Sequence, residues 1–199
     1  VAKLEKQLAE FKKKKPAAQN AIAGVKAPEF AKDYAGAIAK LKPALYAPLN
    51  VAPKNLAVEK GVKVSAEKFA AFAEGRIRGE AKSLGGSYTV SFWFRNDLAN
   101  MARPVTAYLF SRGPNANTRA PGDHLGIGGT STQANGALFL FNGNVAKGFV
   151  GGTTVIAPGT WNHVVLIRSG SRVTAFLNGQ AKPEFDGEIK PTAADSREF

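Results

Sequence analysis

The sequence predicts a mainly β protein, an antiparallel β-sandwich that is preceded by an N-terminal helical hairpin. Three observations favour this fold class. Short segments alternate apolar with polar residues, turn dipeptides separate these segments about every ten residues, and Phe and Gly are frequent, with 13 and 21 among 199 residues. Short strands and turn signals at such a spacing are typical of sandwiches and barrels. The sequence shows no strand–helix alternation of the kind that builds a parallel sheet.

The helical hairpin is expected over residues 1–43, where apolar residues recur at helical intervals. The two apolar stripes consist of Leu4, Leu8 and Phe11 and of Phe30, Tyr34, Ile38 and Leu41. Pro16 ends the first helix, and the second begins near Pro28 and stops at Pro43, because proline fits a first helical turn but not an interior one. We therefore divide the chain into a hairpin at 1–43 and a sandwich at 44–199.

The net charge of +12 is concentrated in the N-terminal part of the chain. Residues 1–82 hold seventeen Lys and Arg against eight acidic residues, a net charge of +9, while residues 83–199 hold ten against seven, a net charge of +3. We expect the lysine-rich leader to be a spacer that packs its apolar stripe on a neighbouring domain. A helix that lies on a membrane surface or binds nucleic acid is the alternative, and we do not expect a nucleic-acid partner. Since no run of eighteen residues is wholly apolar, we expect no membrane span.

Period-two alternation predicts the strands of the sandwich. The expected strands are 44–49, which would open the domain, then 88–95, 105–111, 137–141, 164–168 and 172–177. Asn142-Gly143 and Asn178-Gly179 predict tight turns, because Asn and Gly both tolerate a positive φ. Ser169-Gly170-Ser171 is expected to join the last two strands.

Four of these segments, in this order, resemble the laminin G-like, concanavalin A-like jelly roll. They are the aromatic strand 88–95, the segment 108–113 that ends in Gly, the Trp-Asn-His-Val strand 161–168, and the strand 173–179 that ends in Asn-Gly. The segment Gly122–Gly129 further resembles bacterial versions of this module in large exported or surface proteins. The resemblance covers residues 44–190 and implies a jelly-roll sandwich that binds glycans or protein partners and is not an enzyme.

The candidate ligand site consists of one tryptophan and four arginines in and beside the expected loops. These residues are Trp93, Arg95, Arg103, Arg112 and Arg119. Trp93 faces away from its aromatic neighbours in the strand and is suited to stack on a sugar ring. A guanidinium pairs bidentately with sulfate or carboxylate, which suggests an acidic polysaccharide as ligand. The alternative is that the arginines are ordinary surface charges and that Trp93 lies under a loop.

The sequence predicts no metal ion and no cofactor. Many laminin G-like domains hold calcium, which needs several carboxylates close together. Asp97 and Asp123 are the only acidic residues between Glu80 and Glu184, and neither has an acidic neighbour. Asp123-His124 could be a ligand pair, but an Asp in a turn before a strand is the commoner meaning. Since the chain has no Cys, thiolate sites and disulfides are excluded.

A further candidate is the acidic segment that runs from Glu184 to Glu188. Its Glu-x-Asp-x-Glu pattern resembles the strand of family-sixteen glycoside hydrolases, in which Glu184 would be the nucleophile, Asp186 its orienting partner and Glu188 the acid/base. Pro183 and Gly187 are expected to interrupt the strand, so we interpret the segment as a solvated acidic flank. The second histidine of the chain, His163, is expected to be half-buried and satisfied.

The function predicted from the sequence is non-catalytic recognition of a carbohydrate or a protein within a larger exported or surface protein. Its location would be extracellular, periplasmic or on the cell surface. The alternative is a structural spacer or assembly module with no ligand of its own. Because no closing strand follows the Asn178-Gly179 turn, we expect residues 44–49 to expose an unpaired edge. The missing strand would then follow Phe199 in a longer polypeptide or come from a partner.

Overall fold

The computed structural model describes the N-terminal leader in part and most of the β domain. The described residues are 5, 34–64, 69–81, 86–113, 122–143, 148–191 and 199. The chain divides into two compact units, Val1–Tyr46 and Ala47–Phe199. The boundary expected from the sequence, between residues 43 and 44, stays a prediction.

The first unit contributes one described helix, α2 (Tyr34–Lys40). It lies within the second predicted helix and ends before Pro43, where Lys42 adopts a φ of 48°. Of the predicted first helix only Glu5 is described, as helical, so the structure does not support the hairpin. None of the described helices is long and apolar enough to cross a membrane.

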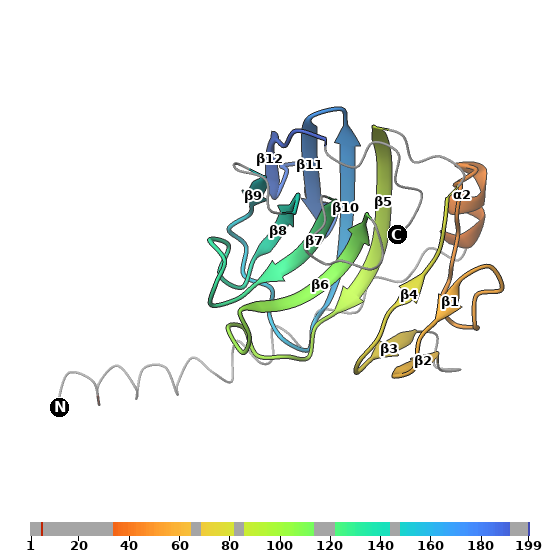
Figure 1. The fold of residues 1–199 in the computed structure, drawn as a ribbon, viewed down its shortest axis with the longest axis horizontal. Coiled ribbons are helices and arrows are strands. Elements are labelled where there is room, and N and C mark those ends of the chain that lie inside the picture. The colour runs from red at the N-terminus through yellow and green to blue at the C-terminus, as the bar shows by residue number, and fades with distance from the viewer. Residues whose placement is uncertain are drawn as a thin grey trace. The chain divides into compact units, whose positions relative to one another are not determined.

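The second unit is built around two four-stranded antiparallel sheets, which confirms the predicted β-sandwich (Figure 1). The first sheet has the order β12-β11-β10-β5 and consists of β5 (Ser87–Arg95), β10 (Trp161–Ser169), β11 (Arg172–Leu177) and β12 (Phe185–Glu188). The second has the order β6-β7-β8-β9 and consists of β6 (Val105–Arg112), β7 (Asp123–Gly128), β8 (Leu138–Phe141) and β9 (Phe149–Gly151).

Two small sheets precede the sandwich in the sequence. One pairs β1 (Ala57–Val58) with β4 (Ile77–Arg78), and the other pairs β2 (Val62–Val64) with β3 (Ala70–Phe72). Beyond β4, Gly79 exchanges two backbone hydrogen bonds of 3.1 Å with Phe199. The last residue of the sequence is thus tied to the segment that leads into the first sheet.

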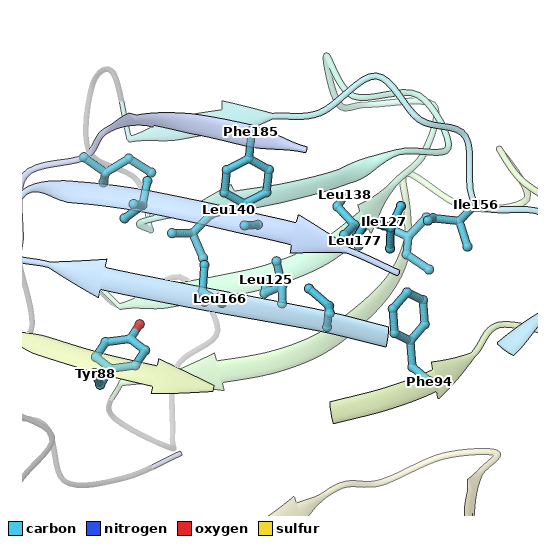
Figure 2. Packing of buried hydrophobic residues seen from close by; sticks show 14 residues of the cluster. Tyr88, Phe94, Leu125, Ile127, Leu138, Leu140, Ile156, Leu166, Leu177 and Phe185 are labelled. Carbon is cyan, nitrogen blue, oxygen red and sulfur yellow. The ribbon is translucent and has the colours of Figure 1, made fainter. Parts of the chain in front are cut away.

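The hydrophobic core fills the space between the two four-stranded sheets. Strand β10 shows why the period-two pattern is informative: Val164 and Leu166 are completely buried, while Trp161 and Ile167 are exposed. Figure 2 shows the inward-facing side chains of both sheets meeting in one cluster, among them Leu125, Leu138, Leu140, Leu166, Leu177 and Phe185. Alternate residues of each strand point to opposite faces of its sheet. The inner face of each sheet therefore packs in this core, and the outer face points away from it.

Two of the three predicted turns are confirmed. Gly170, with a φ of 59°, lies in the two-residue connection between the paired residues Ser169 and Arg172. Asn178 and Gly179 both have a positive φ, and Gln180 N–H donates to the carbonyl of Leu177. The third prediction is wrong, because Asn142-Gly143 does not form a tight hairpin: β8 and β9 pair through Phe141 and Phe149, which leaves a longer connection.

The opening strand predicted at 44–49 is absent from the structure, and the first strand begins at Ala57. Proline explains the difference, since Pro48 and Pro53 offer no backbone donor to a neighbouring strand. Leu49 adopts a φ of 56°, which is incompatible with an extended strand. The expected unpaired edge at 44–49 is therefore not formed.

Candidate functional site

Both tryptophans of the chain lie on the outer face of the first sheet, at the end where β5 finishes and β10 begins. Trp93 pairs with His163, and Arg95 with Trp161, in the β5–β10 ladder. We call the group Trp93, Arg95, Asp97, Trp161 and His163 the tryptophan face. As the sequence predicted, Trp93 faces away from the core, in which its neighbour Phe94 is buried.

One half of the tryptophan face is a packed pair of rings. The centroids of Trp93 and His163 are 5.0 Å apart, at an interplanar angle of 36°. The Nε2 atom of His163 lies 2.9 Å from the hydroxyl of Ser91. Burial lowers the pKa of His163, so the imidazole is neutral near neutral pH. His163 is thus the half-buried, satisfied histidine that the sequence predicted.

The other half of the tryptophan face is an ion pair beside an exposed indole. Arg95 binds Asp97 bidentately, with Nε–Oδ1 and Nη2–Oδ2 distances of 2.9 and 3.0 Å. Its guanidinium carbon lies 5.8 Å from the centroid of the Trp161 ring, and Trp161 is 47% exposed. Hydrogen-bond donors, acceptors and an aromatic surface are therefore all open to a ligand at one place.

The other predicted arginines do not join the tryptophan face. Arg112 is only 3% exposed, and its guanidinium lies over the ring of Tyr88 at 5.1 Å. This placement corrects the expectation of a surface guanidinium at Arg112. Arg103 is exposed in the connection between β5 and β6, and its carbonyl accepts a hydrogen bond from Thr130 N–H. Arg119 lies outside the described residues.

Asp123 begins β7 and is buried in a polar cluster inside the sandwich, rather than lying in a turn or beside a ligand. Its carboxylate accepts hydrogen bonds from Tyr88 Oη at 2.5 Å and from Asn142 Nδ2 at 3.1 Å. It also pairs with Arg168 Nε at 3.1 Å. Burial, and then the charge of Asp123, raises the pKa of Tyr88 far above its ordinary value. All the groups around Asp123 serve to satisfy a buried charge.

No group of three or more side chains able to hold a metal ion gathers among the described residues. His124, the neighbour of Asp123, contacts Ser111 instead: its Nδ1 atom lies 3.1 Å from the Ser111 hydroxyl. The two residues considered as a ligand pair therefore have separate partners.

Two of the three carboxylates of the hydrolase-like segment are held by hydrogen bonds from elsewhere in the sandwich. Glu184 accepts hydrogen bonds of 2.8 Å from the N–H groups of Thr153 and Thr154. Asp186 binds Arg172 bidentately, and the hydrogen bond from Arg172 is the main reason why the pKa of Asp186 is lowered. Glu188 is exposed. Asp186, which the resemblance makes the orienting partner of the nucleophile, is thus paired with an arginine.

The expectation that Gly187 interrupts this segment is wrong, since Gly187 lies within β12. A Cβ at this position would lie 2.9 Å from a methyl group of Val150 on β9. Glycine therefore allows the edge strand of one sheet to approach the edge strand of the other.

The outer face of the second sheet differs from the tryptophan face because the chain's own residues close it. Phe139 and Phe149 stack there with centroids 5.6 Å apart. The Phe139 ring lies so close to β7 that a Cβ at Gly126 would be 2.8 Å from it. A Cβ at Gly151 would likewise be 2.8 Å from the methyl group of Ala134. Phe139 is only 2% exposed, so its ring is closed to a ligand, whereas Tyr108, which packs against it, is exposed.

The sandwich with its two outer faces defines a jelly-roll domain of the lectin type. Residues 74–199 match the laminin G-type family model described as the Concanavalin A-like lectin/glucanases superfamily. Since the match covers more than half of the chain, the protein belongs to this superfamily, which confirms the resemblance inferred from the sequence.

The other comparisons are less informative. No curated protein matches the sequence. One similar solved structure is domain 4 of AbnA, a GH43 extracellular arabinanase from Geobacillus stearothermophilus, in complex with arabinotriose. It shares 18% sequence identity with this chain at a TM-score of 0.45, over 76% of this chain and 68% of that one.

The sequence missed three residues of the tryptophan face as site residues: Asp97, Trp161 and His163. The sequence does contain a signal for two of them, because Trp161 and His163 are two positions apart in one expected strand and so share a face. The register that brings that strand against 87–95 was not readable from the sequence.

Proposed function

We propose that this protein is a non-catalytic carbohydrate-binding module whose ligand is held by the tryptophan face. The observation that carries the proposal is the exposed indole of Trp161 beside the Arg95–Asp97 pair. The apolar face of a sugar ring packs on an indole, and a paired guanidinium and carboxylate offer both donors and acceptors to sugar hydroxyls. Membership of a superfamily that contains lectins supports this proposal.

A neutral glycan is the ligand class that this site supports best. The acidic polysaccharide predicted from the sequence requires guanidinium groups that are free to pair with sulfate or carboxylate. Arg95 is already paired with Asp97, and Arg112 is buried against Tyr88. On the tryptophan face the positive charge of Arg95 is thus balanced by Asp97. A site without net charge favours the hydroxyl groups of a neutral sugar over anionic groups.

We also propose that the protein is located outside the cell, in the periplasm or on the cell surface, as part of a longer exported polypeptide. This part rests on the resemblance to exported bacterial modules. The hydrogen bonds that hold Glu184 and Asp186 within the sandwich support a role in recognition rather than in hydrolysis.

The test is a binding survey with neutral trisaccharides (cellotriose, maltotriose, laminaritriose and arabinotriose) and with heparin and polygalacturonate as acidic probes. We expect at least one neutral probe to bind, and Trp161→Ala to weaken that binding about tenfold or more. Tyr108→Ala is the matched control, because Tyr108 is an exposed aromatic residue on the second sheet. We expect this control to bind as the wild type does.

The outcomes separate the candidate functions. Binding of the acidic probes alone, weakened by added salt, would restore the acidic polysaccharide as the ligand class. The absence of binding to every probe would contradict glycan recognition and favour a structural spacer or a protein ligand. An equal loss in Tyr108→Ala and Trp161→Ala would contradict the placement of the site.

A further inference from the structure

The small sheet formed by β2 and β3 lies outside the family match, which begins at residue 74. The residue directly before this sheet nevertheless contacts the tryptophan face of the sandwich. Phe69, the residue directly before β3, packs edge-on against Trp161, with centroids 5.9 Å apart and an interplanar angle of 70°. The chain thus adds an aromatic contact to the site from an element that precedes the family module.

Phe69 contacts Trp161, the residue on which the proposed binding of a glycan depends most. Trp161 is the first residue of β10 and is half-exposed. The guanidinium of Arg95 lies over the ring, and the Phe69 ring meets it edge-on. An edge-to-face aromatic contact fixes ring orientation. A ring that is already fixed loses less side-chain freedom when a ligand binds.

We propose that Phe69 is a positioning residue that holds the Trp161 indole ready for a sugar ring. This inference rests on the proposed carbohydrate-binding function and adds to it a residue from outside the family module. Phe69 acts through Trp161, since its ring supports the tryptophan rather than the ligand. The β2–β3 sheet is therefore part of the binding site.

The same small sheet supplies a matched control. Phe72 is the last residue of β3 and pairs with Val62. It is 54% exposed. Phe69→Ala and Phe72→Ala thus remove the same side chain from the same element, and only the first removes the contact with Trp161.

The experiment measures Trp161 and ligand binding in the same proteins. In a Trp93→Phe background, Trp161 is the only tryptophan, so its emission and its quenching by acrylamide report this ring alone. We compare Phe69→Ala, Phe69→Leu and Phe72→Ala, and we titrate each with the neutral trisaccharide that binds best. We expect Phe69→Ala to shift the emission to longer wavelength, to increase quenching, and to weaken binding about fivefold.

Phe69→Leu should fall between the Trp93→Phe parent and Phe69→Ala, and Phe72→Ala should match the Trp93→Phe parent in emission and affinity. If Phe69→Ala binds as the Trp93→Phe parent does, or if Phe72→Ala loses as much affinity as Phe69→Ala, the positioning role is wrong while the binding proposal stands. If the wild type binds none of the trisaccharides, the binding proposal fails and the role of Phe69 fails with it.

Discussion

Two Arg–Asp pairs occupy contrasting places in the sandwich. Arg168 and Asp123 meet inside it, with side chains 2% and 5% exposed and a separation of 3.1 Å. Arg95 and Asp97 meet on the outer face at 2.9 Å, with side chains 38% and 64% exposed. The distances are nearly the same, so the difference lies in what surrounds each pair.

The buried pair is part of a network that connects both sheets. Tyr88 reaches Asp123 from β5 and Asn142 reaches it from the end of β8, while Arg168 on β10 donates to the carbonyl of Ile189. A buried charge that loses its partner is costly, whereas an exposed pair contributes little to stability. Asp123 therefore stabilises the fold, while the exposed Arg95–Asp97 pair is accessible to a ligand.

The largest expected effect is the loss of stability on breaking the buried pair. Asp123→Asn keeps the size of the side chain but leaves Arg168 with an uncompensated buried charge. We expect this variant to lose about 3–5 kcal/mol of unfolding free energy, measured by urea denaturation. Asp97→Asn is the matched control, and we expect it to change stability by about 0–1 kcal/mol. Equal losses in the two variants would show that burial does not distinguish the pairs.

The second prediction concerns binding through the exposed pair. Arg95→Ala and Asp97→Asn should each weaken binding of a neutral trisaccharide about fivefold, as expected for the loss of one or two hydrogen bonds. The double variant should lose less binding free energy than the sum of the two single losses, because each residue positions the other. Isothermal titration at low and high salt checks both points. A strong salt dependence of wild-type binding would contradict a charge-balanced site.

The smallest expected effect is a pH dependence that comes from His163. Burial places its folded-state pKa below the ordinary value of 6.5, so the unfolded chain binds a proton more readily than the folded one. Stability is therefore fully present above the ordinary value and declines as the pH falls through it, levelling off below the folded-state pKa. Melting curves of the wild type and His163→Gln over this range test the effect. A difference between the two that does not change with pH would contradict it.

The sequence predicted the sandwich well because strands that bury one face carry a period-two pattern. Strands β5, β10 and β11 alternate in this way, and they were expected from the sequence within a few residues at their ends, as were β6 and β8. Strand β7 was harder to predict, since all six of its residues are buried and it shows no alternation. The outer surface of β7 is closed by aromatic rings that lie over glycines, a feature that depends on neighbouring strands.

The candidate site was only partly predictable for a related reason. Alternation along a single strand placed Trp93 on the outer face, and the structure agrees. The same local reasoning treated Arg95 and Arg112 alike, although one lies on the outer face and the other is buried over Tyr88. Whether an arginine near the end of a strand is covered depends on residues that are distant in the sequence.

The sequence by itself determined the class of fold, the positions of most core strands and the face on which Trp93 lies, because these follow from local periodicity and turn chemistry. Only the tertiary structure decided which strands pair and which charges are buried. Register across β5 and β10 brought Trp161 to Arg95, and the small β2–β3 sheet brought Phe69 to Trp161. Such contacts join residues far apart in the chain, and no local pattern specifies them, since the free energy of packing depends on the whole fold.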